Sequence, residues 1–136
     1  MNVAVGSDNL STVLVVVGAA IVRDGRLLAA RRSAPPAVAG GWEFPGGKVE
    51  PGESEVAALV RECREELGVE VWVGALLGTV APAEFVLRVY RAVLVAGEPR
   101  PLQDHDELRW LAAHELADVP WLPADVPLLP AIREAL

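Results

Sequence analysis

Acidic residues gather at one end of a helix-length segment in the first half of the chain. Residues 53–66 contain five glutamates and two arginines. Glu62, Glu65 and Glu66 are spaced i, i+3 and i+4, which places them on one face of a helix, where like charges repel. Carboxylates that converge on one point are the ligands that a hard divalent cation prefers. The alternative is a solvated, glutamate-rich surface relieved by an Arg61–Glu65 pair.

A glycine pair precedes this acidic segment. Pro45-Gly46-Gly47 lets the main chain approach closely, and it offers a free carbonyl to a metal or free N–H groups to a phosphate. A tight turn between a strand and a helix would use the same residues. The glycines and the carboxylates together favour a site for a divalent cation and phosphate groups.

An apolar stripe follows helical spacing over residues 54–67 and predicts a helix that packs one side on a sheet. The stripe consists of Val56, Leu59, Val60, Cys63 and Leu67. Glu53 or Ser54 supplies the N-cap, and Gly68 takes the position after the last helical turn. Cys63 is therefore expected to be a small core residue rather than a nucleophile.

The other predicted elements are mostly strands. They cover residues 13–23, 26–31, 42–44, 69–80, 85–95 and 108–111, with a helical turn at 114–117 and a C-terminal helix at 126–136. Asp24-Gly25 is a strong hairpin signal, and the Pro- and Gly-rich residues 33–41 form a loop. Because strands and helices interleave without regular βαβ alternation, we expect an α+β fold, an α/β/α sandwich with a mixed sheet and helices on its faces.

Composition limits the kind of protein. The 136 residues suit one domain, which we place at 13–136 after a flexible N-terminus at 1–12, and the 52% hydrophobic and 23% charged residues are typical of a soluble protein. A net charge of −7 argues against binding a nucleic acid polymer. The longest apolar run, 13–22, is too short to span a membrane. The single cysteine excludes an internal disulfide, so we expect a cytoplasmic protein.

The pattern from residue 47 to residue 69 resembles the Nudix box. Gly47, Glu53 and the run Arg-Glu-Cys-Arg-Glu-Glu-Leu-Gly-Val at 61–69 match its fixed positions, with Cys63 where an aliphatic residue is usual. Such a match arises by chance on the order of once in a billion starts. The stretches AARR, WEFPGGKVEPGE and WLPADVPLL are similar to MutT-type hydrolases, and most similar to the branch of bacterial CTP pyrophosphohydrolases and mycobacterial MutT-like proteins. The resemblance implies the Nudix fold.

The same resemblance implies a Mg²⁺-dependent enzyme, with Mn²⁺ as a substitute, that cleaves nucleoside triphosphates to the monophosphate and pyrophosphate. The expected substrates are CTP, dCTP, 5-methyl-dCTP or oxidised purine triphosphates such as 8-oxo-dGTP, as in sanitisation of the nucleotide pool. Alternatives are a Nudix hydrolase of sugar nucleotides, a non-catalytic nucleotide-binding module, and a structural acidic domain. The expected partner is this small-molecule substrate, without nucleic acid polymer or membrane. We expect a monomer, with a homodimer as the alternative.

By position in the box, the resemblance also implies roles for single residues. The catalytic residues would be Glu62, which orients or deprotonates the attacking water, Arg61 and Glu65, with Arg61 fixing Glu65 or Glu53 in place. The metal ligands would be the Gly46 carbonyl, Glu62, Glu65, Glu66 and Asp104. Asp106 and Glu107 compete with Asp104 for the last place.

Substrate-binding residues are implied in three places. Arg32 matches an arginine aimed at the phosphates, and Arg31 would face away because strand residues alternate; two surface arginines are the alternative. Main-chain groups of Glu43 and Phe44 match positions that touch the base. Asp125 would read the base as an ionised carboxylate, which only accepts hydrogen bonds. It would favour an amino group such as cytosine N4, or a protonated or tautomeric edge of a modified purine.

Some of these residues have other readings. Asp125 would alternatively N-cap the last helix, or do both. Trp42, Phe44 and Trp121 are candidates to line the base pocket, although Trp is also an ordinary core residue. His105 and His114 lack the spacing of a soft-metal site, and we expect structural roles for them.

Overall fold

A computed structural model describes residues 13–82 and 84–136, so the predicted flexible segment 1–12 lies outside the described residues. The elements run in the order β1 (Leu14–Arg23), β2 (Arg26–Arg32), β3 (Trp42–Glu43), β4 (Gly46–Lys48), α2 (Glu55–Leu67), β5 (Glu70–Val80), β6 (Phe85–Ala96), β7 (His105–Leu111), two 3₁₀ turns η1 (Ala113–Asp118) and η2 (Val126–Leu128), and α3 (Leu129–Ala135).

The strands form one mixed sheet, as predicted. The order along the sheet is β3-β2-β1-β6-β5, with β4 paired to β1 and β7 paired to β2. β1 and β6 are parallel over eight residue pairs, from Leu14↔Phe85 to Ile21↔Ala92, and the other strand pairs are antiparallel. The first half of β1 therefore lies between β4 and β6, whereas its end turns into the hairpin with β2.

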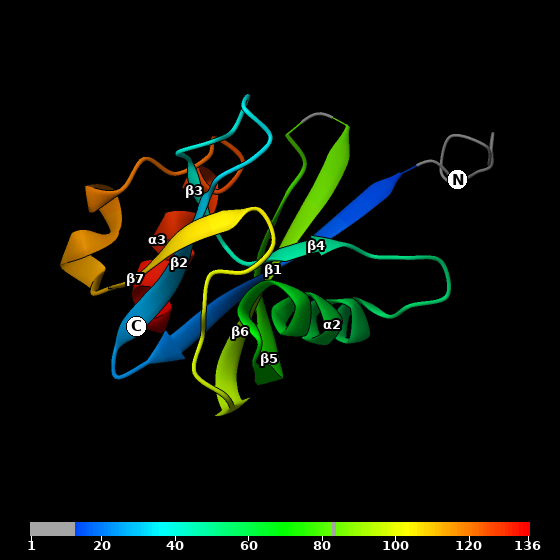
Figure 1. Ribbon diagram of the computed structural model, residues 1–136, viewed down its shortest axis with the longest axis horizontal. Helices are drawn as coiled ribbons and strands as arrows, with labels where there is room; N and C mark the ends of the chain where they lie inside the picture. The colour runs from blue at the N-terminus through cyan, green and yellow to red at the C-terminus, as the bar shows by residue number, and fades with distance from the viewer. Residues whose placement is uncertain (1–12, 83) are drawn as a thin grey trace.

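Helices cover both faces of the sheet, which confirms the expected α/β/α sandwich (Figure 1). On the α2 side, the core joins Leu59, Cys63 and Leu67 to β1 residues such as Val17 and Ile21. On the opposite side, α3 and the 3₁₀ turns pack on a second core that includes Phe44, Leu87, Leu116, Leu128 and Ile132. Apolar residues on both faces of β1 and β2 explain why these strands are buried from two sides.

The ends of α2 are fixed by the predicted caps. The Ser54 hydroxyl accepts a hydrogen bond from the Ala57 N–H at 3.0 Å, and Gly68 adopts φ 70°, so that its N–H reaches the Arg64 carbonyl at 3.0 Å. The predicted apolar stripe is wrong at Val56, which is 47% exposed. Val56 lies in the first turn of α2, ahead of the residues from Ala58 onward that are buried against the sheet.

Three element boundaries differ from the sequence prediction. Residues 46–48 form β4 rather than a stop, because β1 supplies partners such as Gly18↔Gly46 that glycine propensity does not signal. β7 begins at His105, three residues early, because its first residues pair with β2. The C-terminal helix is divided into η2 and α3, since Pro127 and Pro130 cannot donate backbone hydrogen bonds. None of the helices in the described part of the chain is long and apolar enough to cross a membrane.

Candidate active site

Arg61 ties the acidic residues of α2 to the loop before it. Its Nε and Nη2 donate to the two Glu53 oxygens at 2.7 and 3.0 Å, and Nη1 donates to Glu62 at 3.0 Å and to Glu65 at 3.3 Å. Nη2 also donates to the Lys48 carbonyl at 3.0 Å. The hydrogen bonds from Arg61, helped by the Glu50 N–H, lower the pKa of Glu53 to about 2. Arg61 therefore contacts Glu53 and Glu65, the two partners expected from the sequence, and also Glu62.

Gly46 and Gly47 let β4 lie directly against the end of α2. The Gly46 N–H donates to Glu66 Oε1 at 3.0 Å. A Cβ on Gly47 would collide with the Glu62 carboxylate, whose Oε1 would lie 2.9 Å from it. A Cβ on Gly46 would collide with the backbone of β1. Both glycines are therefore required for the approach that places Glu62 and Glu66 beside β4.

Glu62 and Glu66 form a sheltered carboxylate pair. Burial is the main cause that raises the pKa of each, and the charge of the other acidic groups adds to it, while Arg61 opposes the shift at Glu62 and His105 and the Gly46 N–H oppose it at Glu66. Neighbouring carboxylates in this situation are stabilised in their charged form by a cation. An all-oxygen donor set is the kind that Mg²⁺ or Mn²⁺ prefers, so the residues present fit a hard divalent ion.

The other expected metal ligands are not drawn into this pair. The Glu65 side chain is 43% exposed and contacts Arg61. Asp104 is exposed at φ 55°, and the contact that the structure gives it is through its carbonyl, which accepts from the Ser33 N–H at 2.7 Å. Across residues 13–82 and 84–136, no three His, Cys, Asp or Glu side chains are grouped closely enough to hold a metal ion. The structure thus shelters Glu62 and Glu66 together. Glu65 stays at the surface, joined to Glu62 through Arg61 Nη1, and the Asp104 side chain is exposed.

Arg31 and Arg32 point to opposite sides of β2, as strand alternation predicted. Arg31 pairs with Asp106 at 2.7 Å and with Glu107 at 3.3 Å, so the two competitors of Asp104 are held on the far side. Arg32 Nη1 donates to Glu43 at 3.2 Å, while its Nε and Nη2 donate to the Ala34 carbonyl at 3.0 and 2.6 Å. Arg32 therefore lies on the side of the sheet where Glu43 enters the site.

His105 fixes the Glu43 carboxylate and was not recognised from the sequence as part of the site. Its Nε2 lies 2.8 Å from Glu43 Oε2 and its Nδ1 lies 2.8 Å from the Gln103 carbonyl. Because the Gln103 carbonyl can only accept, Nδ1 donates to it, and Nε2 faces the Glu43 carboxyl group. Burial lowers the pKa of His105, but Glu43 and Glu66 outweigh burial and raise it overall. Only the pairing of β2 with β7, which places His105 opposite Arg32, could have assigned His105 to the site.

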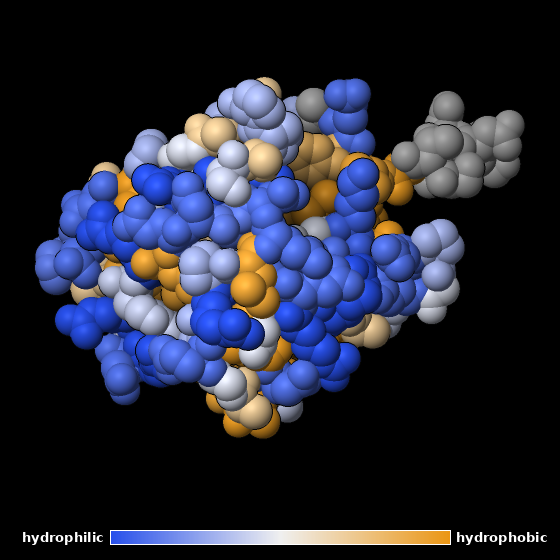
Figure 2. Space-filling view, viewed as in Figure 1, coloured by the Kyte–Doolittle hydropathy of each residue, from blue (hydrophilic) through white to orange (hydrophobic). Residues whose placement is uncertain are grey.

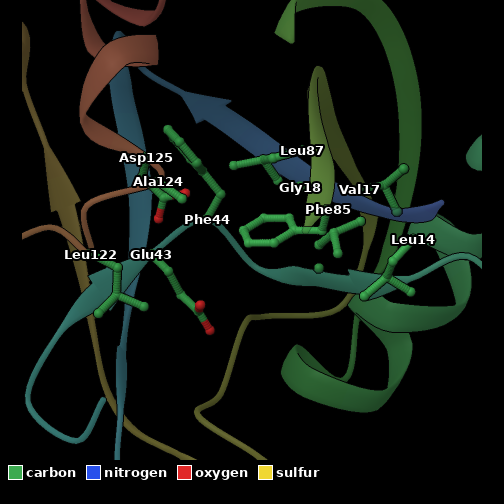
Figure 3. A pocket seen from close by; sticks show the side chains of 12 residues that line it. Leu14, Val17, Gly18, Glu43, Phe44, Phe85, Leu87, Leu122, Ala124 and Asp125 are labelled. Atoms are coloured by element: carbon green, nitrogen blue, oxygen red, sulfur yellow. The ribbon is translucent and has the colours of Figure 1, made fainter. Parts of the chain in front are cut away.

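A mostly apolar cavity of about 220 Å³ lies next to β4. It is lined by Leu14, Val16, Val17, Gly18, Glu43, Phe44, Gly46, Phe85, Leu87, Leu122, Ala124 and Asp125. Figure 3 shows Leu122 and Ala124 on one side, Phe85, Leu87 and Leu14 on the other, and the Glu43 side chain extending between them. In Figure 2 this face of the molecule is largely hydrophilic, with apolar side chains visible in a hollow near the start of β1. The cavity is smaller than the pockets of about 300–1,000 Å³ that hold drug-sized ligands, so it suits one planar ring.

Asp125 lines this cavity, and its side chain does not cap η2. Asp125 is 6% exposed and holds the N-cap position of η2, where its carbonyl accepts from the Leu128 N–H at 3.0 Å, but its side chain makes no capping hydrogen bond. The Phe44 N–H donates to its carboxyl group, whereas Oδ2 is buried and has no partner within the described residues. Burial, and then the charge of Glu43, raise the pKa of Asp125 to about 8. Burial thus favours the protonated form of this carboxyl group over the ionised form that base reading was expected to use.

The aromatic candidates divide between cavity and core. Phe44 lines the cavity. Trp121 packs against Phe44 from behind, with ring centroids 5.2 Å apart, and its indole N–H donates to the Leu116 carbonyl at 2.6 Å. Trp42 is buried in the core on the α3 side. Of the expected base-pocket aromatics, only Phe44 is among the cavity residues that the structure gives.

The fold and the site define a class: an α/β/α protein in which a glutamate-bearing helix borders a ring-sized pocket. Comparison with known proteins agrees. The NUDIX domain family matches residues 12–132. A Mycobacterium tuberculosis protein provisionally named 8-oxo-dGTP diphosphatase 2 is 51% identical over 116 residues, 82% of each chain. The CTP pyrophosphohydrolase of Escherichia coli K12 is 43% identical over 120 residues, 85% of this chain and 88% of that protein.

Solved structures show the same relationship. The solution structure of the E. coli ORF135 protein has a TM-score of 0.75 at 39% identity and covers 90% of both chains. The crystal structure of a MutT Nudix hydrolase from Burkholderia pseudomallei has a TM-score of 0.73 at 36% identity, over 90% of this chain and 98% of that one. The chain belongs to the Nudix family, as a hydrolase of the MutT type. Hydrolases of this family generally need a divalent metal ion.

Proposed function

We propose that this Nudix hydrolase cleaves nucleoside triphosphates to the monophosphate and pyrophosphate with Mg²⁺, or Mn²⁺ as a substitute. One observation carries the proposal. Gly46 lines the cavity and, through its N–H, also holds Glu66 of the carboxylate pair. A base in the cavity would therefore place its attached phosphates next to Glu62 and Glu66.

The metal ion would be held by Glu62 and Glu66, joined by the Gly46 carbonyl, Glu65 and Asp104. When bound, it would supply charge neutralisation of the triphosphate and a more acidic water. The all-oxygen set supports Mg²⁺ and Mn²⁺ over softer ions.

The protein's own residues would position and activate the reacting groups. Arg61 and Gly47 fix the Glu62 carboxylate, which would orient the attacking water or accept its proton. Arg61 and Glu65 support this role from the outer side of the helix. Arg32, held by Glu43 and by the Ala34 carbonyl, would contact the phosphates. An arginine at this place favours planar, bidentate contact with phosphate oxygens.

The base would lie in the apolar cavity. Phe44 and the apolar walls would stack on it, main-chain groups of Glu43 and Phe44 would contact its edge, and Asp125 would read that edge. The names of the relatives support 8-oxo-dGTP and CTP as substrates, in sanitisation of the nucleotide pool. The proposal extends the cytosine substrates to dCTP and 5-methyl-dCTP. A sugar nucleotide is less well supported, because the cavity offers room for one ring. A non-catalytic module is disfavoured because the box carboxylates are all present.

The test is pyrophosphate release from a panel of nucleoside triphosphates with Mg²⁺, comparing the wild type with Glu62→Gln. We expect kcat to fall about 100-fold or more, because an amide neither accepts the proton nor carries the charge that holds a metal. Glu70→Gln is the matched control, since Glu70 pairs with the exposed Arg64 outside the site at 2.6 Å. Unchanged turnover in Glu62→Gln would remove the assignment, and a wild type that binds nucleotides without turnover would favour the non-catalytic module.

A further inference from the structure

The Glu43 carboxylate is contacted by two side chains on the same oxygen atom. Arg32 Nη1 donates to Glu43 Oε2 at 3.2 Å, and His105 Nε2 lies 2.8 Å from this same atom. The His105 side chain is fully buried, whereas the side chains of Arg32 and Glu43 are 20% and 19% exposed. A buried imidazole therefore lies behind two charged side chains that reach the solvent.

An irregularity in the pairing of β2 with β7 places His105 on this face. Arg31 lies opposite Glu107, but Arg32 lies opposite His105, so Asp106 is an extra residue between the two pairs. With regular pairing, Asp106 would lie opposite Arg32 and would share its face of the sheet. A β-bulge redirects side chains in this way. The bulge thus leaves Asp106 with Arg31 on the far side and puts the histidine beside Arg32.

The segment before β7 connects this cluster to the carboxylate helix. The Leu102 N–H donates to the Glu66 carbonyl at 2.9 Å, and the Asp104 carbonyl accepts from the Ser33 N–H at 2.7 Å. Ser33 directly follows Arg32, the last residue of β2. This short segment therefore joins the end of α2, which carries the sheltered carboxylates, to the end of the strand that carries the arginine.

The guanidinium group of Arg32 keeps donors for a ligand. Glu43 engages one N–H of Nη1, and the Ala34 carbonyl engages Nε and one N–H of Nη2. An arginine has five N–H donors, so one on Nη1 and one on Nη2 have no partner among the described residues. Donors on both Nη atoms can bind two oxygens of a phosphate group. Glu43 and Ala34 together thus fix the plane of a group that is still able to bind phosphate.

We infer that His105 is a positioning residue for phosphate binding, which holds the Arg32 guanidinium toward the substrate phosphates through its contact with the Glu43 carboxylate. This inference rests on the proposed function, and it adds a residue that acts through Glu43. The alternative is that His105 only fills the core and anchors the preceding loop through its Nδ1 contact with Gln103 at 2.8 Å. The two roles use different ring nitrogens, so substitutions can separate them.

Two amide substitutions make this separation. His105→Gln carries a donor at about the position of Nε2 and keeps the contact with Glu43. His105→Asn carries a donor at about the position of Nδ1 and keeps only the contact with Gln103. His114→Asn is the control, since His114 is exposed on η1.

Binding is measured by isothermal titration calorimetry with Mg²⁺ and a CTP analogue in which a methylene group replaces the oxygen between the α and β phosphorus atoms. His105→Asn should weaken binding about tenfold, and His105→Gln by less than about threefold. In an Arg32→Gln background, His105→Asn should change the affinity by less than about twofold, because residues that act through one another are not additive.

Glu43→Ala is the second variant, and it keeps the test decisive if His105→Asn does not fold. Removal of a negative charge next to a triphosphate would by itself tighten binding. If Glu43 serves to hold Arg32, the same substitution should instead weaken binding about tenfold. The direction of the change therefore distinguishes positioning from charge.

An equal loss of affinity in His105→Asn and His105→Gln overturns the inference, as does a loss of the same size in the Arg32→Gln background. Tighter binding by Glu43→Ala, or a wild type that does not bind the analogue, also overturns it. Pyrophosphate release from CTP is measured separately. A wild type that binds the analogue but hydrolyses no triphosphate would contradict the proposed function, and the affinities would still decide the role of His105.

Discussion

The Glu62 carboxylate lies against the α-carbon of Gly47, in the space that a β-carbon at residue 47 would fill. This contact joins the short strand β4 to α2, and it acts together with the hydrogen bond from the Gly46 N–H to Glu66 at 3.0 Å. The absence of a side chain at residue 47 is therefore part of how the carboxylates are placed.

Replacement of Gly47 by alanine should displace Glu62 and lower kcat about tenfold or more, with a folded protein. Gly47 has no positive φ, so its backbone tolerates alanine, and the effect should come from the side chain that must move. Gly52→Ala is the control. Gly52 has φ 80° and nothing within 4 Å of an added Cβ, so stability should fall by about 1 kcal/mol while kcat stays unchanged. Equal kcat in Gly47→Ala and wild type would contradict the role of this contact.

Substitution of Arg61 by glutamine should lower kcat about 10- to 100-fold with a smaller change in KM. Arg61 contacts Glu53, Glu62 and Glu65 and is only 24% exposed in its side chain, so its loss frees the carboxylates from their fixed positions. Arg64→Gln is matched in chemistry and lies on the same helix, but it pairs only with Glu70 on the surface, where an ion pair contributes little. Steady-state kinetics of both variants decide the matter, and a similar loss in each would point to general weakening of α2.

Neighbouring arginines on β2 allow a second matched pair. Arg32→Gln should raise KM for the triphosphate about tenfold, because it removes a cation on the site side of the strand, whereas Arg31→Gln should leave KM within about twofold. Arg31 is held by Asp106 and Glu107 on the opposite side. KM values measured over several salt concentrations check this prediction. An equal rise in KM for both variants would contradict the prediction, because it would show that only the total positive charge of β2 matters.

The state of Asp125 also predicts how stability depends on pH. Its pKa rises from 3.8 in the unfolded chain to about 8 in the fold, so between these values the folded protein holds a proton that the unfolded chain lacks. Stability from this group is therefore fully present below pH 4 and declines as pH rises toward 8. Asp125→Asn does not titrate, and its stability relative to wild type should increase by at least about 1 kcal/mol between pH 4.5 and pH 8.5.

Urea unfolding at pH 4.5, 6.5 and 8.5 measures this difference. Asp118→Asn is the control, since Asp118 is exposed at the end of η1 and lies outside the cavity lining. A constant difference between Asp125→Asn and wild type over this range would show that the acid is ionised in the fold.

Much of the local structure was predictable because it depends on residues close in sequence. The helix 55–67 follows from apolar spacing and from its caps at Ser54 and Gly68, and the hairpin follows from Asp24-Gly25. Opposite orientations of Arg31 and Arg32 follow from strand alternation alone. The error at Val56 arose because periodicity gives the direction of a side chain but not where the sheet beneath it ends.

The parts of the site that were missed depend on pairing between distant segments. His105 reaches Glu43 because β7 and β3 both pair with β2, which places residues 62 positions apart within 2.8 Å. The apolar walls of the cavity come from β1, β6 and the turn before η2, and no local pattern relates Leu14 to Leu122.

By itself the sequence determined the Nudix family, the carboxylate helix and the glycine pair that precedes it, because these are fixed by residue types at fixed spacing. Only the tertiary structure decided that Glu62 and Glu66 are the sheltered pair, that Asp125 lines a cavity, and that burial raises the pKa of its carboxyl group there. The reason is physical. Burial and the charge of neighbours set the state of an acid, and both arise only when strands far apart in the chain come together.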